Sequence, residues 1–324
     1  MTRPKIYVTR GVRPSVLTHL SEVCETRSWT GPGRCPADQL EKEIAEVDAV
    51  LGTDRWTAAL MDKAPRLRII ALTAVGFDSV DLPAATERGI IVTNTAGSLT
   101  DTVADLVFAL ILAAARRVCE MDRWVRAGQW QGAAPMALDV HHKMLGIVGF
   151  GRIGTAVAER ARGFQMPVCY HDVVRRQDLE KQCGYRFVDL ASLLRESDFI
   201  TIHTALTPQT RGMIGEAQFG TMKRTAFLIN TSRGPVVDEP ALIKALQQGR
   251  LAGAGLDVFE KEPIDPENPL LKMENVVLLP HVGSATEATR QAMVDLATDN
   301  VLAVLQGRVP LTPVNPEVLS RSKG

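Results

Sequence analysis

Apolar and polar positions in the first hundred residues form an alternating series of short segments. Apolar runs of strand length occur at residues 5–9 (KIYVT), 48–52 (DAVLG), 67–73 (LRIIALT) and 90–94 (IIVTN). Between the first two lies SVLTHLSEV (15–23), in which apolar residues recur at helical spacing. Strands that alternate with helices predict an α/β fold built on a parallel sheet.

A much longer helical segment begins near residue 98. We predict one helix over residues 98–130, with Thr100 or Asp101 at its start and apolar side chains on most faces up to Arg116. A helix this apolar must be buried between layers. Its apolar core, residues 106–115, is much shorter than the roughly 20 residues that cross a bilayer, which argues against a membrane span.

A second α/β series follows this helix. A second long amphipathic helix, residues 284–307, then precedes a polar tail that contains proline. We therefore predict two doubly wound parallel-sheet domains joined by the two long helices, with the chain end returning to the first domain. The second series contains six strand-like segments: 144–148, 167–172, 198–204, 226–232, 254–259 and 276–282.

The stretch GIVGFGRIG carries three glycines with the spacing of a dinucleotide-binding turn. They follow an apolar strand and open a helical segment, the context in which GxGxxG predicts a cofactor rather than a merely structural turn. Gly149 permits the tight turn, Gly151 lets the backbone approach a pyrophosphate, and Gly154 lets the helix pack on the strand. The phosphates are then expected on the N–H groups of Arg152 and Ile153.

The next strand ends at Asp172, 18 residues after Gly154. An acidic residue about 20 residues beyond the glycines binds the adenosine ribose and repels the 2′-phosphate of NADP, so Asp172 favours NAD. Arg175 and Arg176 lie close by, and a nearby arginine can accept that phosphate. We interpret the two arginines as a solvated helix start and predict NAD, with NADP as the alternative.

Three polar residues follow apolar strands of the second series: Arg233, Glu262 and His281. Ligands of open α/β sheets bind outside the carboxyl ends of the strands, so all three are predicted to face one crevice. Reduction of a 2-oxo acid needs a hydride at the carbonyl carbon and a proton at its oxygen. Arg233 is suited to grip the carboxylate, His281 to transfer the proton and Glu262 to orient the imidazole, while a cofactor supplies the hydride.

Composition narrows the class of protein. Of the 324 residues 45% are apolar, and 37 basic side chains balance 37 acidic ones, so no net charge favours nucleic acid or an anionic membrane as partner. The N-terminus lacks the apolar region of a signal peptide. The five cysteines include no CxxC pair, which predicts a reduced, cytoplasmic protein without a zinc site. The sequence also has no cluster of His and Cys residues, so we predict no metal site.

Four motifs in order, GIVGFGRIG, NTSRGPVVDE, GLDVFEKEP and LPHVGSAT, resemble those of the D-isomer-specific 2-hydroxyacid dehydrogenases, and the similarity extends over essentially the whole chain. The stretches VHHKMLGIVGFGRIG and LLRESDFI are most similar to the bacterial glyoxylate/hydroxypyruvate and 2-ketogluconate reductases. The resemblance implies NAD(P)H-dependent reduction of these small 2-oxo acids to D-2-hydroxy acids. It also implies a flavodoxin-like substrate-binding domain of residues 1–98 and 288–324, and a Rossmann-type cofactor domain of residues 99–287.

The resemblance assigns further residues. It implies that backbone N–H groups of Val75 and Gly76 bind the substrate carboxylate, together with Arg233. It places Thr102 and Asp257 at the nicotinamide end of the cofactor, and it implies a homodimer formed through the cofactor domain. The predicted cofactor set is Thr102, Gly149, Gly151, Arg152, Ile153, Gly154, Asp172, Thr231, Asp257 and Gly283.

Two other functions share these motifs. Phosphite dehydrogenases resemble the chain but carry a lysine in the loop where Ala74, Val75 and Gly76 stand here. Non-catalytic, NAD-sensing corepressors of the same fold also keep the Arg–Glu–His set. Only a measurement of turnover therefore separates such a binding protein from a reductase. His203 either lines the cofactor or caps its strand. Met136 and Leu138, in a loop without the aromatic residue of close relatives, either cover the substrate site or serve packing.

Overall fold

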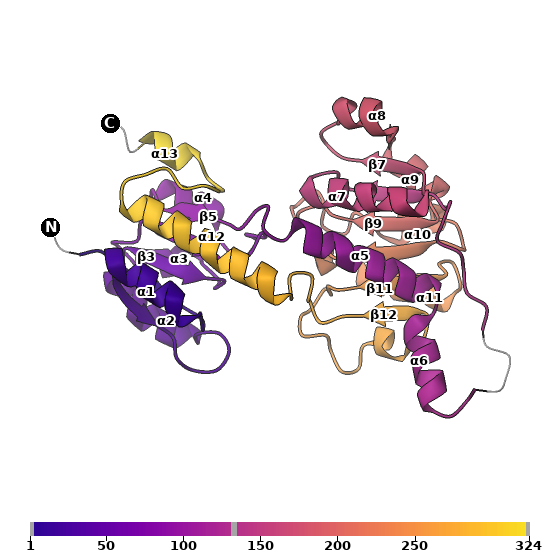
Figure 1. The fold of residues 1–324 in the computed structure, drawn as a ribbon, viewed down its shortest axis with the longest axis horizontal. Coiled ribbons are helices and arrows are strands. Elements are labelled where there is room, and N and C mark those ends of the chain that lie inside the picture. Colours follow the sequence, from indigo (N-terminus) through magenta and orange to yellow (C-terminus); the bar gives the residue numbers. More distant parts are fainter. Residues whose placement is uncertain (1–2, 131–134, 322–324) are drawn as a thin grey trace. The chain divides into compact units, whose positions relative to one another are not determined.

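The computed structural model describes residues 3–130 and 135–321. The chain divides into two compact units, each with its own sheet (Figure 1). The first unit comprises Met1–Leu99 and Ala285–Gly324, and the second comprises Thr100–Ser284.

The first unit contains a five-stranded sheet in the order β2-β1-β3-β4-β5, with every pair of neighbours parallel. This is the flavodoxin-like strand order. Successive strands are added on one side of the first strand and then, from the third strand on, on its other side. The strands are β1 (Lys5–Val8), β2 (Glu25–Ser28), β3 (Ala49–Gly52), β4 (Ile69–Leu72) and β5 (Ile91–Thr93).

Helices cover both faces of this sheet because successive strand residues point to opposite sides. Ile6 and Val8 pack with residues of α1 and α12, while Tyr7 packs with residues of α2, α3 and α4. Figure 1 shows α12 lying across the strands of this unit. The helices are α1 (Pro14–Val23), α2 (Ala37–Glu43), α3 (Ala58–Asp62), α4 (Leu82–Glu87), α12 (Glu287–Leu305) and α13 (Glu317–Arg321), with a 3-10 turn at Ile44–Glu46.

The second unit contains a seven-stranded parallel sheet in the order β12-β11-β10-β9-β6-β7-β8. Successive strands are added on one side of β6 as far as β8, and from β9 on they are added on its other side. This is the Rossmann arrangement, in which the ligand crevice lies between β6 and β9. The strands are β6 (Leu145–Val148), β7 (Val168–His171), β8 (Arg186–Phe187), β9 (Phe199–Ile202), β10 (Phe227–Asn230), β11 (Gly253–Leu256) and β12 (Val276–Leu278).

One face of the second sheet packs against α5 and α7, and the other against α9, α10 and α11. The α/β fold with two parallel sheets, predicted from alternating strands and helices, is confirmed. The helices are α5 (Thr100–Ala115), α6 (Val118–Arg126), α7 (Arg152–Ala161), α8 (Gln177–Cys183), α9 (Leu190–Glu196), α10 (Glu216–Thr221) and α11 (Glu239–Gln247), with 3-10 turns at Arg162–Phe164, Gly234–Val236 and Pro269–Lys272.

The prediction of one helix over residues 98–130 is wrong, because the chain breaks between α5 and α6. Arg117 has a left-handed backbone, with φ of 54°, which costs a non-glycine residue roughly 1–2 kcal/mol. Its guanidinium forms two hydrogen bonds, of 2.7 and 2.9 Å, with the buried carboxylate of Glu120. The helix therefore ends where its apolar run ends, and a charged pair fixes the new direction.

Two strands escaped prediction, β2 and β8. Both are at edges of their sheets, and both are short and polar (ETRS and RF), so neither shows the apolar run that marks an interior strand. Among the described residues, no helix has the length and apolar character needed to cross a membrane.

Candidate active site

Arg233, Glu262 and His281 come from loops that follow three neighbouring strands, β10, β11 and β12. The structure brings two of them into direct contact, because Nδ1 of His281 lies 2.7 Å from Oε2 of Glu262. Arg233 is close enough for its charge to act on Glu262. The predicted gathering of these side chains at one edge of the second sheet is therefore what the structure shows.

The glycine after Arg233 explains how the two loops come together. A Cβ atom at Gly234 would overlap the backbone of Phe259, in the loop that carries Glu262. Only glycine permits this close approach of one backbone to the other. The backbone of Arg233 is held in turn, since Nδ2 of Asn230 donates to its carbonyl oxygen at 3.0 Å.

Glu262 is held as an ionised partner for the imidazole. Its Oε1 accepts a 3.1 Å hydrogen bond from the backbone N–H of Phe259. Partial burial works to raise the pKa of Glu262, but the hydrogen bonds from His281 and Phe259 and the positive charges of His281 and Arg233 together lower it below its ordinary value. The carboxylate is thus available to accept the Nδ1 proton.

Asp257 fixes the loop that carries His281. His281 has a left-handed backbone with φ of 55°, a conformation that non-glycine residues rarely adopt. The carboxylate of Asp257 accepts the N–H groups of Val282 and Gly283, both at 2.8 Å, and its carbonyl accepts the N–H of His281 at 2.9 Å. Burial raises the pKa of Asp257 although both amide hydrogen bonds lower it.

The glycine turn has the shape expected of a phosphate cradle. It joins the end of β6 to the start of α7, and Gly149 has φ of 91°. A Cβ atom there would lie 2.8 Å from the backbone of His203, and one at Gly154 would overlap the carbonyl of Gly149. A Cβ at Gly151 would meet nothing within 4 Å, so the open space of the turn lies in front of Gly151, where α7 presents its first N–H groups.

Asp172 follows β7 directly and faces the glycine turn. Its Oδ2 accepts the N–H of Phe150 at 2.5 Å, and its Oδ1 accepts the N–H of Val174 at 3.0 Å. Both neighbouring arginines are in ion pairs: Arg175 with Glu180 at 2.7 Å, and Arg176 with Asp178 at 2.8 Å. Arg176 also stands at the start of α8, as predicted.

Polar groups without partners mark the carboxyl ends of β9 and β10. Within the described part of the chain, His203 Nε2 and the hydroxyls of Thr204 and Thr231 are buried and make no hydrogen bond. A buried polar group without a partner is costly, so these atoms suit the polar groups of a dinucleotide bound beside the turn. Thr204 was missed by the sequence analysis, although it follows a strand at the reversal point of the sheet.

The remaining predicted residues divide between the two units. Val75 and Gly76 belong to the first unit, where the loop after β4 is held by a 2.8 Å hydrogen bond from Nδ2 of Asn94 to the carbonyl of Val75. Thr102 lies in the first turn of α5 in the second unit. A Cβ at Gly283 would lie 3.4 Å from Val103, so the start of α5 is beside the loop of His281.

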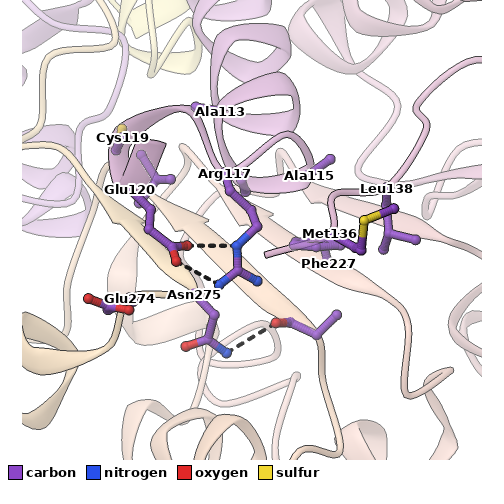
Figure 2. Close-up of a pocket in the computed structure, with 13 residues that line it drawn as sticks. Ala113, Ala115, Arg117, Cys119, Glu120, Met136, Leu138, Phe227, Glu274 and Asn275 are labelled. Atoms are coloured by element: carbon purple, nitrogen blue, oxygen red, sulfur yellow. Dashed lines mark hydrogen bonds and ion pairs between the residues drawn. The ribbon is translucent and has the colours of Figure 1, made fainter. Parts of the chain in front are cut away.

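A cavity of about 110 Å³ lies at the opposite edge of the second sheet (Figure 2). It is lined by Phe227, at the amino end of β10, by the Arg117–Glu120 ion pair, and by Met136 and Leu138. The N–H of Leu138 donates to the carbonyl of Ala115, at the far end of α5 from Thr102. Met136 and Leu138 therefore lie at the amino edge and do not cover the catalytic edge of their own chain.

Metal ligands are not gathered anywhere in residues 3–130 and 135–321, where no group of three or more His, Cys, Asp or Glu residues is placed to hold an ion. The five cysteines are free thiols.

The family model for the D-isomer-specific 2-hydroxyacid dehydrogenase NAD-binding domain matches residues 108–283. Glyoxylate reductase from Korarchaeum cryptofilum is 49% identical over 98% of this chain and 97% of its own length. The corresponding enzyme from Thermococcus litoralis is 47% identical over 99% of both chains.

Two solved structures are similar over nearly the whole chain. The TT0316 protein from Thermus thermophilus has a TM-score of 0.88 and 43% identity, covering 96% of this chain and 99% of its own. An NADPH-dependent glyoxylate/hydroxypyruvate reductase from Sinorhizobium meliloti, solved with NADP and malonate, has a TM-score of 0.86 and 38% identity, covering 97% of both chains.

Proposed function

Because the chain belongs to the D-isomer-specific 2-hydroxyacid dehydrogenase family and is an NAD(P)-dependent oxidoreductase, we propose that it reduces small 2-oxo acids to D-2-hydroxy acids. Glyoxylate, hydroxypyruvate and 2-ketogluconate are the proposed substrates. The observation that carries the proposal is the 2.7 Å contact between His281 and Glu262, on a loop packed against that of Arg233.

The proton is assigned to His281. With Nδ1 bonded to Glu262, the proton to be transferred is carried by Nε2, on the other side of the ring. The His281 side chain is 47% exposed, so a substrate carbonyl can reach it. Bound NAD(P)H supplies the hydride, and the chain supplies position and electrostatics.

His203 is unsuited to this role. Its Nε2 is buried although part of the residue reaches the surface, and burial lowers the pKa of His203 to about 3. A ring that stays neutral at physiological pH has no extra proton to give.

Arg233 is assigned to the substrate carboxylate. Its guanidinium offers a planar fork of donors that matches a carboxylate and that can also polarise the neighbouring carbonyl. We assign the backbone N–H groups of Val75 and Gly76, from the first unit, to the same carboxylate. On this assignment the first unit is the substrate-binding domain, and the second is the cofactor domain that also carries Arg233 and His281.

The preferred cofactor is proposed to be NAD. Asp172 places a carboxylate beside the glycine turn, which repels a 2′-phosphate, and Arg175 and Arg176 are already engaged in ion pairs. NADP is the alternative, since the Sinorhizobium meliloti relative is NADPH-dependent.

We propose a homodimer formed through the second unit. The support is a group of exposed apolar side chains at and beyond α6: Val118, Val125, Trp130 and Met136 are each at least half exposed. An apolar surface of this kind is typical of a subunit interface.

The test is the oxidation of NADH, and separately of NADPH, with purified protein and glyoxylate, hydroxypyruvate, 2-ketogluconate or pyruvate. Turnover with one or more of these acids is expected. If intact protein binds cofactor but reduces none of the acids, the proposal fails. Phosphite-dependent reduction of NAD⁺ would then identify the phosphite dehydrogenase alternative, and its absence would leave the cofactor-sensing alternative.

A further inference from the structure

The carboxyl edge of the first sheet carries positive charge at its reversal point. Thr9 and Arg10 follow β1, and Asp54 follows β3, so these residues flank the place where the order of strands in this parallel sheet changes direction. In open α/β sheets, that place is where ligands bind.

Three arginines contribute positive charge there. The backbone of Arg34 pairs with that of Arg10 in an antiparallel bridge. Arg290, in the first turn of α12, is close enough for its charge, like that of Arg34, to lower the pKa of Arg10, which burial already lowers. Arg10 is half-buried, whereas the other two are exposed.

The cluster has more positive than negative charge. Within the described residues none of the three guanidinium groups is in an ion pair, and the one carboxylate whose charge reaches Arg10 is that of the buried Asp54. The Oδ2 of Asp54 is bonded to the hydroxyl of Thr9 at 2.5 Å. The positive charges of Arg10, Arg34 and Arg290 repel one another. A bound anion would offset this repulsion.

The cluster adjoins the loop assigned to the substrate. Nη1 of Arg10 donates a 3.2 Å hydrogen bond to the hydroxyl of Thr73, and Thr73 directly precedes the loop that contains Val75 and Gly76. A substrate whose first carboxylate is bound by that loop would have its other end within the same unit as the arginines.

We propose that Arg10, Arg34 and Arg290 form a binding site for a second anionic group at the far end of the 2-oxo acid. The substrate class then extends beyond glyoxylate, hydroxypyruvate and 2-ketogluconate to 2-oxo acids with a distal carboxylate or phosphate, which react more efficiently than matched acids with a neutral end. This inference rests on the proposed function, because it extends the substrate class of the same reaction.

Two pairs of compounds isolate the second charge. 2-Oxoglutarate and 2-oxopentanoate have the same five-carbon chain and differ in a terminal carboxylate against a methyl group. Phosphohydroxypyruvate and hydroxypyruvate differ in a terminal phosphate. The protein is expected to favour the charged member of at least one pair by about tenfold or more in kcat/KM, and the pair that shows it identifies the anion.

The double variant Arg34→Gln/Arg290→Gln removes two exposed charges and is expected to fold normally. The preference for the charged member should fall about tenfold, toward a ratio of one. Arg308→Gln is the matched control, because Arg308 is also exposed but lies beyond the other end of α12, and it should leave the ratio unchanged. A wild-type ratio near one for both pairs, or a ratio that the double variant keeps, overturns the proposal, as does a loss confined to the KM of the cofactor.

A binding measurement separates failure of this inference from failure of the proposed function. Titration calorimetry of 2-oxoglutarate and of 2-oxopentanoate into the protein with NAD⁺ needs no turnover. Tighter binding of 2-oxoglutarate that the double variant loses supports the site even if no acid is reduced. Equal binding of the two compounds by the wild-type protein refutes it even if glyoxylate is reduced.

Discussion

Nδ1 of His281 lies 2.7 Å from Oε2 of Glu262, although the two residues are 19 positions apart and follow different strands. The contact depends on two further features of the same edge. Asp257 holds the loop of His281 through its backbone N–H groups, and Gly234 lets the loops of Arg233 and Glu262 pack together. The proposed chemistry follows from this arrangement, since a carboxylate so placed keeps the imidazole oriented.

Replacing Glu262 by Gln should keep the shape of the side chain but remove its charge. We expect kcat/KM for 2-oxo acid reduction to fall about 10²-fold. Steady-state rates at varied concentrations of substrate and cofactor measure the loss. A variant that keeps near-normal kcat/KM would contradict the orienting role of Glu262.

Arg233→Ala should separate substrate binding from cofactor binding. We expect kcat/KM for glyoxylate to fall at least about 10³-fold, because the carboxylate loses a charge-assisted pair of hydrogen bonds. The Kd of NADH, measured by fluorescence titration, should stay within about threefold. Near-normal catalytic efficiency in this variant would remove Arg233 from the mechanism.

The strand-end position of this set could be predicted because parallel strands align their carboxyl ends, so residues just beyond them share one edge whatever lies between. The contacts that fix the geometry of the set could not be predicted. In the sequence Asp257 is a single polar residue within an apolar stretch, and only the folded loop shows that its carboxylate accepts the N–H groups of Val282 and Gly283. The left-handed backbone of His281 likewise has no signal in the sequence.

Other features depend on contacts between distant segments. The break at Arg117 follows from an ion pair with a buried glutamate, which helical periodicity does not reveal. The edge strands β2 and β8 could not be predicted either, because they are short and polar and only their pairing with a neighbouring strand makes them strands. Arg10 and Arg34 are 24 positions apart, but Arg290 lies 256 positions beyond Arg34, and only the folded first unit brings its charge near Arg10.

Asp172→Asn should relax the choice of cofactor. Asparagine keeps an oxygen for the N–H of Phe150 but loses the charge that repels a 2′-phosphate. We expect the ratio of kcat/KM for NADPH to that for NADH to rise about tenfold. Asp122→Asn removes one exposed charge on α6 and serves as the control, for which no change is expected. An unchanged ratio in Asp172→Asn would mean that other groups select the cofactor.

His203 should make the stability of the protein depend on pH. Its ring stays neutral in the folded protein above about pH 3, whereas in the unfolded chain it takes up a proton near pH 6.5. The unfolded chain therefore binds more protons between these values, so the free energy of unfolding falls as the pH drops below 6.5, by about 1.4 kcal/mol per unit.

The variant His203→Gln does not titrate at this position. Between pH 6.5 and 5 its free energy of unfolding should fall about 2 kcal/mol less than that of the wild-type protein, as measured by urea unfolding. Parallel curves for the two proteins would show that the ring titrates normally in the folded state. The same variant should keep the pH profile of the reaction, because the proposed proton donor is His281.

The central claim is that hydride passes from the cofactor to C2 of a 2-oxo acid while the protein supplies the proton to its oxygen. The most direct measurement reduces hydroxypyruvate with NADH that carries deuterium at both C4 positions and analyses the product by NMR and chiral chromatography. The account predicts D-glycerate with one deuterium at C2 for each NADH consumed. L-Glycerate, or glycerate without deuterium at C2, would contradict it.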